Sequence, residues 1–293
     1  MKTIAFVGLG TMGLPMAKHL VSKGFEVRGF DVRPAAVAAL KAAGGTAAAS
    51  AVSAADGADA LVLMVVNAAQ AESILFGEKA LAALSKGGTV ILMATCSPRA
   101  VEGIAAKVIG SGRRFVDAPV SGGVAGASGA TLTIMAAAPK ATFDAVQPVL
   151  AAFGDKIFHV GEKPGQGAMA KTVNQLLCGV HIAAAAEALS LAAKVGMDRS
   201  VLLAIVGNSA ASSWMLRDRG PRMLQAGPDV TSAIDIFVKD LGIVLEAGRD
   251  SKAALPLASA AHQLFIATSG RGDGAADDSQ IIRSYDLING NKA

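Results

Sequence analysis

The apolar residues in the first half of the chain fall into short runs, and amphipathic stretches separate these runs. Short, nearly continuous apolar runs are typical of buried strands in a parallel sheet, whereas the stretches between them fit helices that cover the sheet. We expect strands over residues 3–8, 26–30, 59–66, 89–94, 114–120, 131–136 and 156–160. Helices are expected over residues 14–22, 34–43, 70–84, 98–109 and 143–153. The alternation predicts an α/β fold.

The pattern changes at about Gly165, where a long helix is expected to begin and to run to about Gly196. This helix is apolar nearly all round, so we expect it to be buried, and at ~1.5 Å per residue it spans roughly 40 Å. The chain beyond it reads as helices and loops without strands, with helices expected from Phe237, over 257–268 and over 280–287. We therefore expect an α/β domain over residues 1–162 and an all-α domain over residues 163–293, joined by the long helix.

A glycine-rich turn follows the first expected strand and precedes the first expected helix. Its residues are Gly8, Leu9, Gly10, Thr11, Met12 and Gly13, and Asp31 follows the second strand. This order of strand, GxGxxG turn, helix, strand and acid is that of a dinucleotide-binding Rossmann domain. Gly8 permits the tight turn, Gly10 lets backbone amides approach a pyrophosphate, and Gly13 lets helix and strand pack closely.

The residue at the end of the second strand bears on the choice of dinucleotide. The carboxylate of Asp31 can accept hydrogen bonds from ribose hydroxyls and would repel a 2′-phosphate, so NAD is favoured over NADP. Arg33 lies two residues on and could soften that preference, although a solvated turn residue before Pro34 is the simpler interpretation.

Other candidate ligand contacts lie at the carboxyl ends of later strands, where open α/β sheets bind ligands. Val66 and Asn67 end one strand, and Thr95 lies on the loop between a strand and a helix that Ser97 and Pro98 begin. Cys96 is interpreted as a small loop residue rather than a reactive thiol, since no His or second Cys is near it in sequence.

The stretch DAPVSGGVAGA, residues 117–127, is dense in glycine. It offers the hydroxyl of Ser121 and the amides of Gly122 and Gly123 as a cradle for a carboxylate. The alternative is a flexible hairpin loop before the next strand, and the sequence leaves both interpretations open.

The first turns of the long helix place an amine and a carboxamide on one face, because Lys171 and Asn174 are three residues apart. A single lysine is more often a surface residue whose stem packs on the protein. A lysine near its reference pKa of ~10.4 is also a poor base at neutral pH, although burial or a second cation lowers that pKa.

Composition excludes some classes of function. The chain has 27 basic and 23 acidic residues, one Trp and one Tyr, and its basic residues are scattered, which argues against a nucleic-acid surface. Charged residues interrupt the apolar stretches, and no apolar leader precedes the first strand, so we expect no membrane span and no signal peptide. Cys96 and Cys178 make neither a disulfide framework nor a zinc site. A cytoplasmic protein with a small anionic substrate is expected, and no metal site is predicted.

Five motifs occur in one order along nearly the whole chain: GLGTMG, DAPVSGG, GQGAMAKTVNQ, VKDL and GDGAADDS. In this order they resemble the β-hydroxyacid dehydrogenase family. The resemblance implies a Rossmann domain, a helical domain, a homodimer or homotetramer, and hydride transfer between NAD and a small hydroxy acid. It implies that Lys171 is the catalytic residue and that Asn174, Ser121, Gly122 and Gly123 bind the substrate. It also implies that Thr95 and Lys239 bind the cofactor, with Lys239 close to the nicotinamide.

Two departures from the family pattern suggest a subgroup. The family often has Asn-Asn where this chain has Asn174-Gln175, and Met-Leu-Pro where it has Val65-Val66-Asn67. Within the family the chain resembles L-threonate dehydrogenases most. Alternatives are 3-hydroxyisobutyrate dehydrogenase and tartronate or succinic semialdehyde reductase. An imine reductase and a dinucleotide-binding scaffold without activity are remote alternatives, because both would be expected to lack the lysine. A direct role for Asp277 is a hypothesis beside its role as a helix cap.

Overall fold

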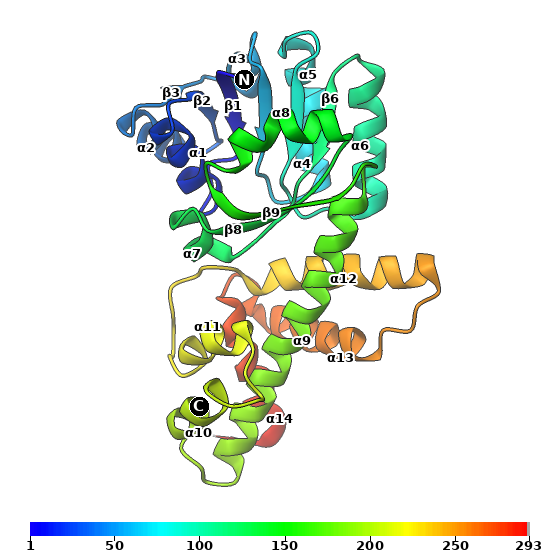
Figure 1. Ribbon diagram of the computed structural model, residues 1–293. Helices are drawn as coiled ribbons and strands as arrows, with labels where there is room; N and C mark the ends of the chain where they lie inside the picture. The colour runs from blue at the N-terminus through cyan, green and yellow to red at the C-terminus, as the bar shows by residue number, and fades with distance from the viewer. Residues whose placement is uncertain (292–293) are drawn as a thin grey trace. The chain divides into compact units, whose positions relative to one another are not determined.

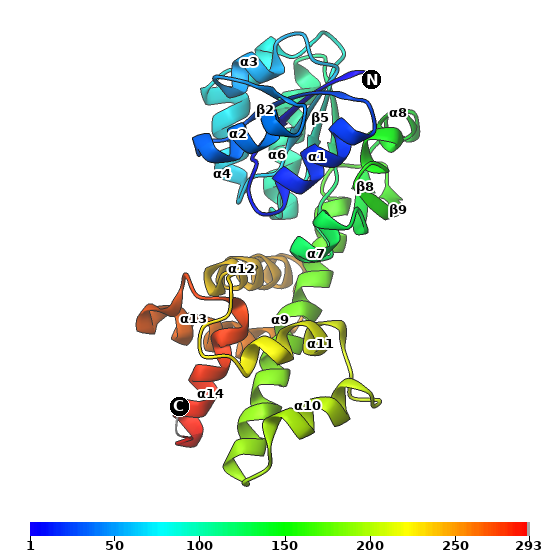
Figure 2. The same ribbon diagram turned by 90° about the vertical axis from the view of Figure 1, so that its left-hand side faces the viewer.

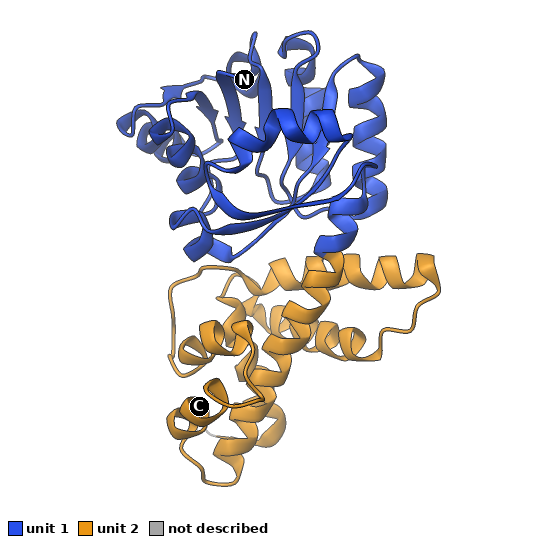
Figure 3. Cartoon of the chain, in the orientation of Figure 1, with its two compact units in different colours: residues 1–171 blue, residues 172–293 orange. Residues whose placement is uncertain are grey.

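The structure, a computed structural model, describes residues 1–291 of the chain. Contacts divide the chain into unit 1, residues 1–171, and unit 2, residues 172–293 (Figure 3). The division falls nine residues after the expected boundary at 162, inside the long helix, and the domain boundary itself stays a prediction. Unit 1 is built on a sheet and unit 2 consists of helices (Figure 1), so the predicted fold class is confirmed.

Unit 1 contains one sheet of nine strands within the described residues. Its strands are β1 (Thr3–Val7), β2 (Glu26–Phe30), β3 (Thr46–Ala47), β4 (Ala60–Leu63), β5 (Thr89–Leu92), β6 (Arg114–Asp117), β7 (Val120–Ser121), β8 (Leu132–Ala137) and β9 (Gly154–Gly161). The order is β3-β2-β1-β4-β5-β6-β8-β7, with β9 beside β8, and β1 to β6 pair in parallel. This is the doubly wound order of a Rossmann fold, which reverses direction between β1 and β4.

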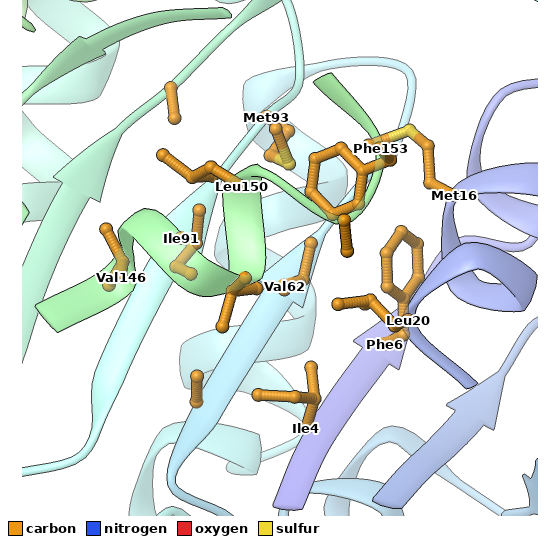
Figure 4. Close-up of a cluster of buried hydrophobic side chains, with 14 of the residues drawn as sticks. Ile4, Phe6, Met16, Leu20, Val62, Ile91, Met93, Val146, Leu150 and Phe153 are labelled. Carbon is orange, nitrogen blue, oxygen red and sulfur yellow. The ribbon is translucent and has the colours of Figure 1, made fainter. Parts of the chain in front are cut away.

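Helices cover both faces of this sheet. They are α1 (Gly13–Ser22), α2 (Pro34–Ala42), α3 (Ala51–Ala55), α4 (Ala68–Glu72), α5 (Ala80–Ala83), α6 (Pro98–Gly110), α7 (Gly123–Ser128) and α8 (Lys140–Leu150). Side chains alternate along each strand, so each face has its own core. Phe6 of β1 belongs to one core with Met16 of α1 and Leu150 of α8 (Figure 4). Val7 belongs to the other core with Ile104 of α6.

Two elements of unit 1 differ from the expected pattern. The helix expected over 70–84 is broken into α4, a π-helical turn over Ser73–Gly77 and α5, because Lys79 adopts a left-handed conformation with φ of 67°. The stretch from Ser121 to Ala127 is neither an open loop nor a flexible hairpin. It continues from β7 into α7, so the loop expected there is wrong.

The predicted long helix is confirmed as α9 (Gln166–Lys194). Unit 2 adds α10 (Arg199–Gly207), α11 (Trp214–Met223), α12 (Ile234–Ser251), α13 (Pro256–Thr268) and α14 (Ile282–Asn289), as Figure 2 shows. Asp277 accepts a hydrogen bond of 3.2 Å from the amide of Ser279 and caps the 3₁₀ turn before α14, which confirms the expected cap. It also pairs with Arg222 at 3.0 Å, an ion pair that accounts for its buried charge.

One face of α9 is exposed, so the expectation that the helix is buried all round is wrong. Val173, Leu177 and Leu191 are 56%, 49% and 58% exposed, and their spacing places them on one stripe. Of the described helices, α9 alone is long and apolar enough to cross a membrane, a property it shares with core helices of soluble proteins. The expected absence of a membrane span therefore stays a prediction.

Candidate functional site

The turn after β1 has three glycines that the fold requires to different degrees. Gly8 has φ of +94°, and a Cβ on it would lie 2.3 Å from the carbonyl oxygen of Met64. A Cβ on Gly13 would lie 1.9 Å from the carbonyl oxygen of Gly8. A Cβ on Gly10 would meet only Arg33 Nη2, at an ordinary 3.6 Å. Packing therefore explains Gly8 and Gly13, whereas Gly10 leaves open space beside the backbone, as close approach of a pyrophosphate requires.

The N-terminus of α1 follows the glycine turn and can contribute to phosphate binding. Its N-cap residue, Met12, has no oxygen in its side chain and makes no capping hydrogen bond. Some helices of unit 1 begin with a polar cap, such as Asn67 before α4 and Ser97 before α6, whereas α2, α5, α7 and α8 also lack a capping side chain. An uncapped helix N-terminus after a glycine turn is a binding site for phosphate, because its amides point outward and the dipole end is positive.

Asp31 lies at the end of β2, next to this turn. Its carboxylate accepts hydrogen bonds from the amide of Leu9 at 2.7 Å and from Arg33 Nε at 2.9 Å. Burial raises the pKa of Asp31, but the hydrogen bonds from Arg33 and Leu9 outweigh burial and leave the pKa lowered. The carboxylate is thus charged and fixed against the glycine turn, where ribose hydroxyls would need an acceptor. Arg33 is exposed yet ion-paired with Asp31, and is not simply a solvated turn residue.

The other predicted cofactor residues of unit 1 follow the carboxyl ends of neighbouring parallel strands, at the same edge of the sheet. Val66 and Asn67 follow β4, and Thr95 follows β5. The Oδ1 of Asn67 accepts a hydrogen bond of 2.9 Å from the amide of Gln70, so this side chain caps α4. Val66 is 50% exposed, which leaves its surface accessible to a ligand.

The glycine pair after Ser121 has a conformation that other residues rarely adopt. Gly122 has φ of 126° and Gly123 has φ of 60°, at the junction between β7 and α7. Ser121 pairs with Thr133 of β8, which fixes the backbone before the glycines. The hydroxyl of Ser121 and the amides of the two glycines therefore belong to an ordered strand–helix junction and not to a flexible loop.

The first turn of α9 is anchored to the end of β6 in a way that the sequence pattern does not show. Asp117 Oδ2 accepts hydrogen bonds from the amides of Gly165 at 3.0 Å and Ala168 at 2.8 Å. A Cβ on Gly167 would lie 2.7 Å from the carbonyl oxygen of Asp117. Gly165 has φ of 91°. The GQG motif is thus required by the attachment of the helix to the sheet, one turn before Lys171.

The buried carboxyl of Asp117 predicts a pH effect on stability. Burial raises its pKa to about 6, although the amides of Ala168, Gly165 and Gly167 oppose this shift. The folded state then binds a proton more tightly than the unfolded state, so the stability that Asp117 contributes is present below pH ~4 and is lost as the pH rises through ~6. Relative to Asp117→Asn, the wild-type free energy of unfolding should fall by about 2.4 kcal/mol between pH 4 and pH 7. Urea unfolding of both proteins at the two pH values measures this difference, and a constant difference would contradict the assignment.

Lys171 lies one turn into α9 and is 7% exposed. The interpretation as a surface lysine is therefore wrong. Asn174 follows three residues later on the same continuous helix and is half-buried, so the amine and the carboxamide share a helix face. A buried amine can exchange a proton with a substrate hydroxyl, and a carboxamide beside it can orient a substrate hydroxyl by a hydrogen bond.

Lys239 belongs to a buried polar cluster of unit 2. Its Nζ lies 2.7 Å from Oδ1 of Asp240, which is 2% exposed. The other oxygen of Asp240 accepts a hydrogen bond of 2.5 Å from Gln175 Nε2, and Gln175 Oε1 accepts one of 2.9 Å from Asn174 Nδ2. The structure thus connects two predicted site residues, Lys239 and Asn174, through Gln175 and Asp240, for which the sequence predicted no site role.

Comparison with known proteins agrees with this geometry. Residues 3–161 match the family described as the NAD binding domain of 6-phosphogluconate dehydrogenase. Residues 165–285 match the family described as the NAD-binding domain of NADP-dependent 3-hydroxyisobutyrate dehydrogenase. The chain is 41% identical over 285 residues to the L-threonate dehydrogenase of Cupriavidus necator, covering 97% of this chain and 96% of that protein. The chain belongs to the β-hydroxyacid dehydrogenase family.

Two further members of the β-hydroxyacid dehydrogenase family show how far the similarity extends. The 3-hydroxyisobutyrate dehydrogenase of Pseudomonas aeruginosa is 34% identical over 273 residues, covering 90% of this chain and 91% of that protein. A crystal structure described as 3-hydroxyisobutyrate dehydrogenase from Salmonella typhimurium has a TM-score of 0.92 and 38% identity, covering 97% of this chain and 99% of that one. The chain is therefore an NAD-binding oxidoreductase that acts on CH–OH donors, and the predicted family is confirmed.

The β-hydroxyacid dehydrogenase site residues fall into two described sets. Unit 1 brings the turn from Gly8 to Gly13 together with Asp31. In the same unit, Asp117 holds the first turn of α9, which precedes Lys171. Unit 2 brings together Asn174 and Lys239. No site role was predicted for Asp117, Gln175 or Asp240, although they stand inside the motifs DAPVSGG, GQGAMAKTVNQ and VKDL. The individual site roles stay predictions.

Proposed function

We propose that this enzyme oxidises L-threonate to 2-oxo-tetronate with NAD, in the catabolism of sugar acids. The observation that supports it most is the buried Lys171, held by the anchored first turn of α9, with Asn174 on the same face. Identity of about 40% over nearly the whole chain to L-threonate dehydrogenases supports this choice of substrate.

Each group has a defined task in this proposal. Lys171 takes the proton of the substrate hydroxyl in oxidation and returns it in reduction. Ser121 and the amides of Gly122 and Gly123 bind the carboxylate, and Asn174 holds a second hydroxyl. NAD, when bound, accepts the hydride from the alcohol carbon. The cofactor is held by Gly10, the first turn of α1, Asp31, Val66, Asn67, Thr95 and Lys239.

The reaction itself tests this proposal. Incubation with L-threonate and NAD should give a ketone two hydrogens lighter than the substrate, detected by mass spectrometry, and an equal amount of NADH. A product from 3-hydroxyisobutyrate alone would favour 3-hydroxyisobutyrate dehydrogenase, the second candidate, which 34% identity to the P. aeruginosa enzyme supports. Activity only as a tartronate or succinic semialdehyde reductase, or only toward cyclic imines, would also overturn it.

The preference for NAD rests on Asp31, and the structure supplies a sharp test. In the wild type, Arg33 Nε donates to the Asp31 carboxylate at 2.9 Å. Asp31→Ser removes this carboxylate and releases the guanidinium of Arg33. The freed guanidinium suits a 2′-phosphate, so the ratio of kcat/KM with NAD to that with NADP should fall at least ~100-fold. Initial rates with both cofactors measure the ratio. The double variant Asp31→Ser/Arg33→Ala should lose the gained use of NADP, and an unchanged ratio in the single variant would contradict the assignment.

We also propose a homodimer or homotetramer in the cytoplasm, without a nucleic-acid or membrane partner. The support is the exposed apolar stripe of α9, Val173, Leu177 and Leu191, which association of subunits would cover. Sedimentation velocity at micromolar concentration should give two or four times the mass of one chain. A single species of monomer mass would contradict this part of the proposal.

A further inference from the structure

The carboxamide of Asn174 has only one orientation that its neighbours accept. Asp240 determines this orientation. Its carboxylate is 2% exposed and pairs with Lys239 Nζ at 2.7 Å. A carboxylate only accepts hydrogen bonds. The group that faces its second oxygen at 2.5 Å is the amide of Gln175, so Gln175 must turn Nε2 toward Asp240.

The orientation of Gln175 fixes that of Asn174. With Nε2 toward Asp240, Gln175 presents Oε1 to its neighbour, and this oxygen needs a donor. Asn174 supplies Nδ2 at 2.9 Å, and the same nitrogen lies 3.3 Å from Cys178 Sγ. The network therefore engages Nδ2 of Asn174, and Oδ1 is the acceptor that this carboxamide can offer to a ligand.

The packing of α12 on α9 holds this chain of hydrogen bonds in place. A Cβ on Gly179 would lie 2.8 Å from Leu241 Cδ2, so glycine is required for this close approach of the two helices. Leu241 follows Asp240 on α12, and Gly179 lies one turn after Gln175 on α9. Gln175 is 7% exposed, so its amide has no solvent to turn toward.

We propose that Gln175 is a specificity-determining residue, which turns the Asn174 carboxamide so that Oδ1 accepts a hydrogen bond from a substrate hydroxyl other than the reacting one. This inference rests on the proposed function. It predicts a preference for polyhydroxy acids over 3-hydroxyisobutyrate, which has no second hydroxyl. It also gives a physical role to Gln175, the residue at which this chain departs from the family pattern Asn-Asn.

The test compares substrates that differ by one hydroxyl. The probes are L-threonate, 2,4-dihydroxybutanoate, which lacks the hydroxyl at C3, and 2,3-dihydroxybutanoate, which lacks the hydroxyl at C4. Wild type should prefer L-threonate over one of the two by ~100-fold or more, because that analogue leaves a buried acceptor unpaired. Gln175→Met keeps the size of the side chain and removes both polar groups. It should lower kcat/KM for L-threonate by roughly 30-fold. For the analogue that wild type disfavours, kcat/KM should stay within about threefold of the wild-type value.

Controls separate this role from a merely structural one. Gln147→Met makes the same chemical change at an exposed position of α8 and should leave every ratio unchanged. Binding of NADH, followed by its fluorescence, should be similar in Gln175→Met and wild type. The thermal unfolding temperature should fall by only a few degrees, because the buried carboxylate of Asp240 loses one donor. Equal losses on all three substrates, or discrimination that survives in Gln175→Met, would overturn the inference.

Failure of the proposed function gives a different result. If wild type turns over another hydroxy acid and not L-threonate, the proposed substrate is wrong. The same comparison is then made with that acid and its deoxy analogues, and the inference stands or falls by it. If wild type turns over no hydroxy acid, both are overturned.

Discussion

Lys171→Ala should lose about 10³-fold in kcat with L-threonate and NAD, while its dissociation constant for NAD stays within about threefold of wild type. The reason is that Lys171 is the buried amine on the predicted substrate face of α9, and positioned proton transfer contributes roughly 10² to 10⁴ in rate. Steady-state rates at saturating substrate measure the loss, and quenching of fluorescence on titration with NADH measures cofactor binding.

A matched control is available close by in the sequence. Lys163 is exposed and precedes α9, so Lys163→Ala removes the same charge from the same region without touching the proposed proton acceptor. It should keep wild-type kcat. Near wild-type activity in Lys171→Ala, or equal losses in the two variants, would show that Lys171 does not move the proton.

Gly167→Ala should lower the free energy of unfolding by about 3 kcal/mol or more, and kcat/KM at least tenfold. An added Cβ would lie 2.6 Å from the carbonyl oxygen of Met135 and 2.7 Å from that of Asp117, and backbone atoms cannot turn aside as a side chain can. The first turn of α9 must then move from β6, and Lys171 moves with it. A misplacement of about 1 Å is enough to cost 10²-fold in rate. Urea unfolding and steady-state kinetics measure the two effects.

Gly103→Ala is the matched control for this substitution. Gly103 lies in the middle of α6, is exposed, and has no heavy atom within 4 Å of an added Cβ. Alanine there should stabilise the protein by about 1 kcal/mol, because glycine is a poor helix former, and should leave kcat/KM unchanged. If Gly167→Ala behaves like Gly103→Ala, the anchor of α9 does not require glycine.

The elements that the sequence predicted well are those whose signal is local. The expected strand over 26–30 agrees with β2 in full, because its apolar residues and flanking turns are adjacent in sequence. The break in the helix expected over 70–84 depends on the left-handed Lys79, a residue type with no special preference for that conformation. The apolar face of α9 was expected to be buried, yet periodicity reports only that a helix is apolar and does not say what covers it.

The candidate site shows the same limit. The GxGxxG turn and Asp31 were found because their spacing alone carries the chemistry of a dinucleotide site. Asp117 and Ala168 are 51 residues apart, and Gln175 and Asp240 are 65 residues apart. No local pattern links such pairs, so the anchor of α9 and the orientation of Asn174 become visible only when the chain is folded.

The measurement that tests the account most directly is the absorbance of reduced nicotinamide formed from NAD by wild type and by Lys171→Ala. The substrates are L-threonate, D-erythronate, D-glycerate, 3-hydroxyisobutyrate and 4-hydroxybutyrate. The account predicts that wild type prefers L-threonate and that Lys171→Ala loses this turnover. Turnover of L-threonate that survives in Lys171→Ala, or no turnover of any of the five by wild type, would contradict it.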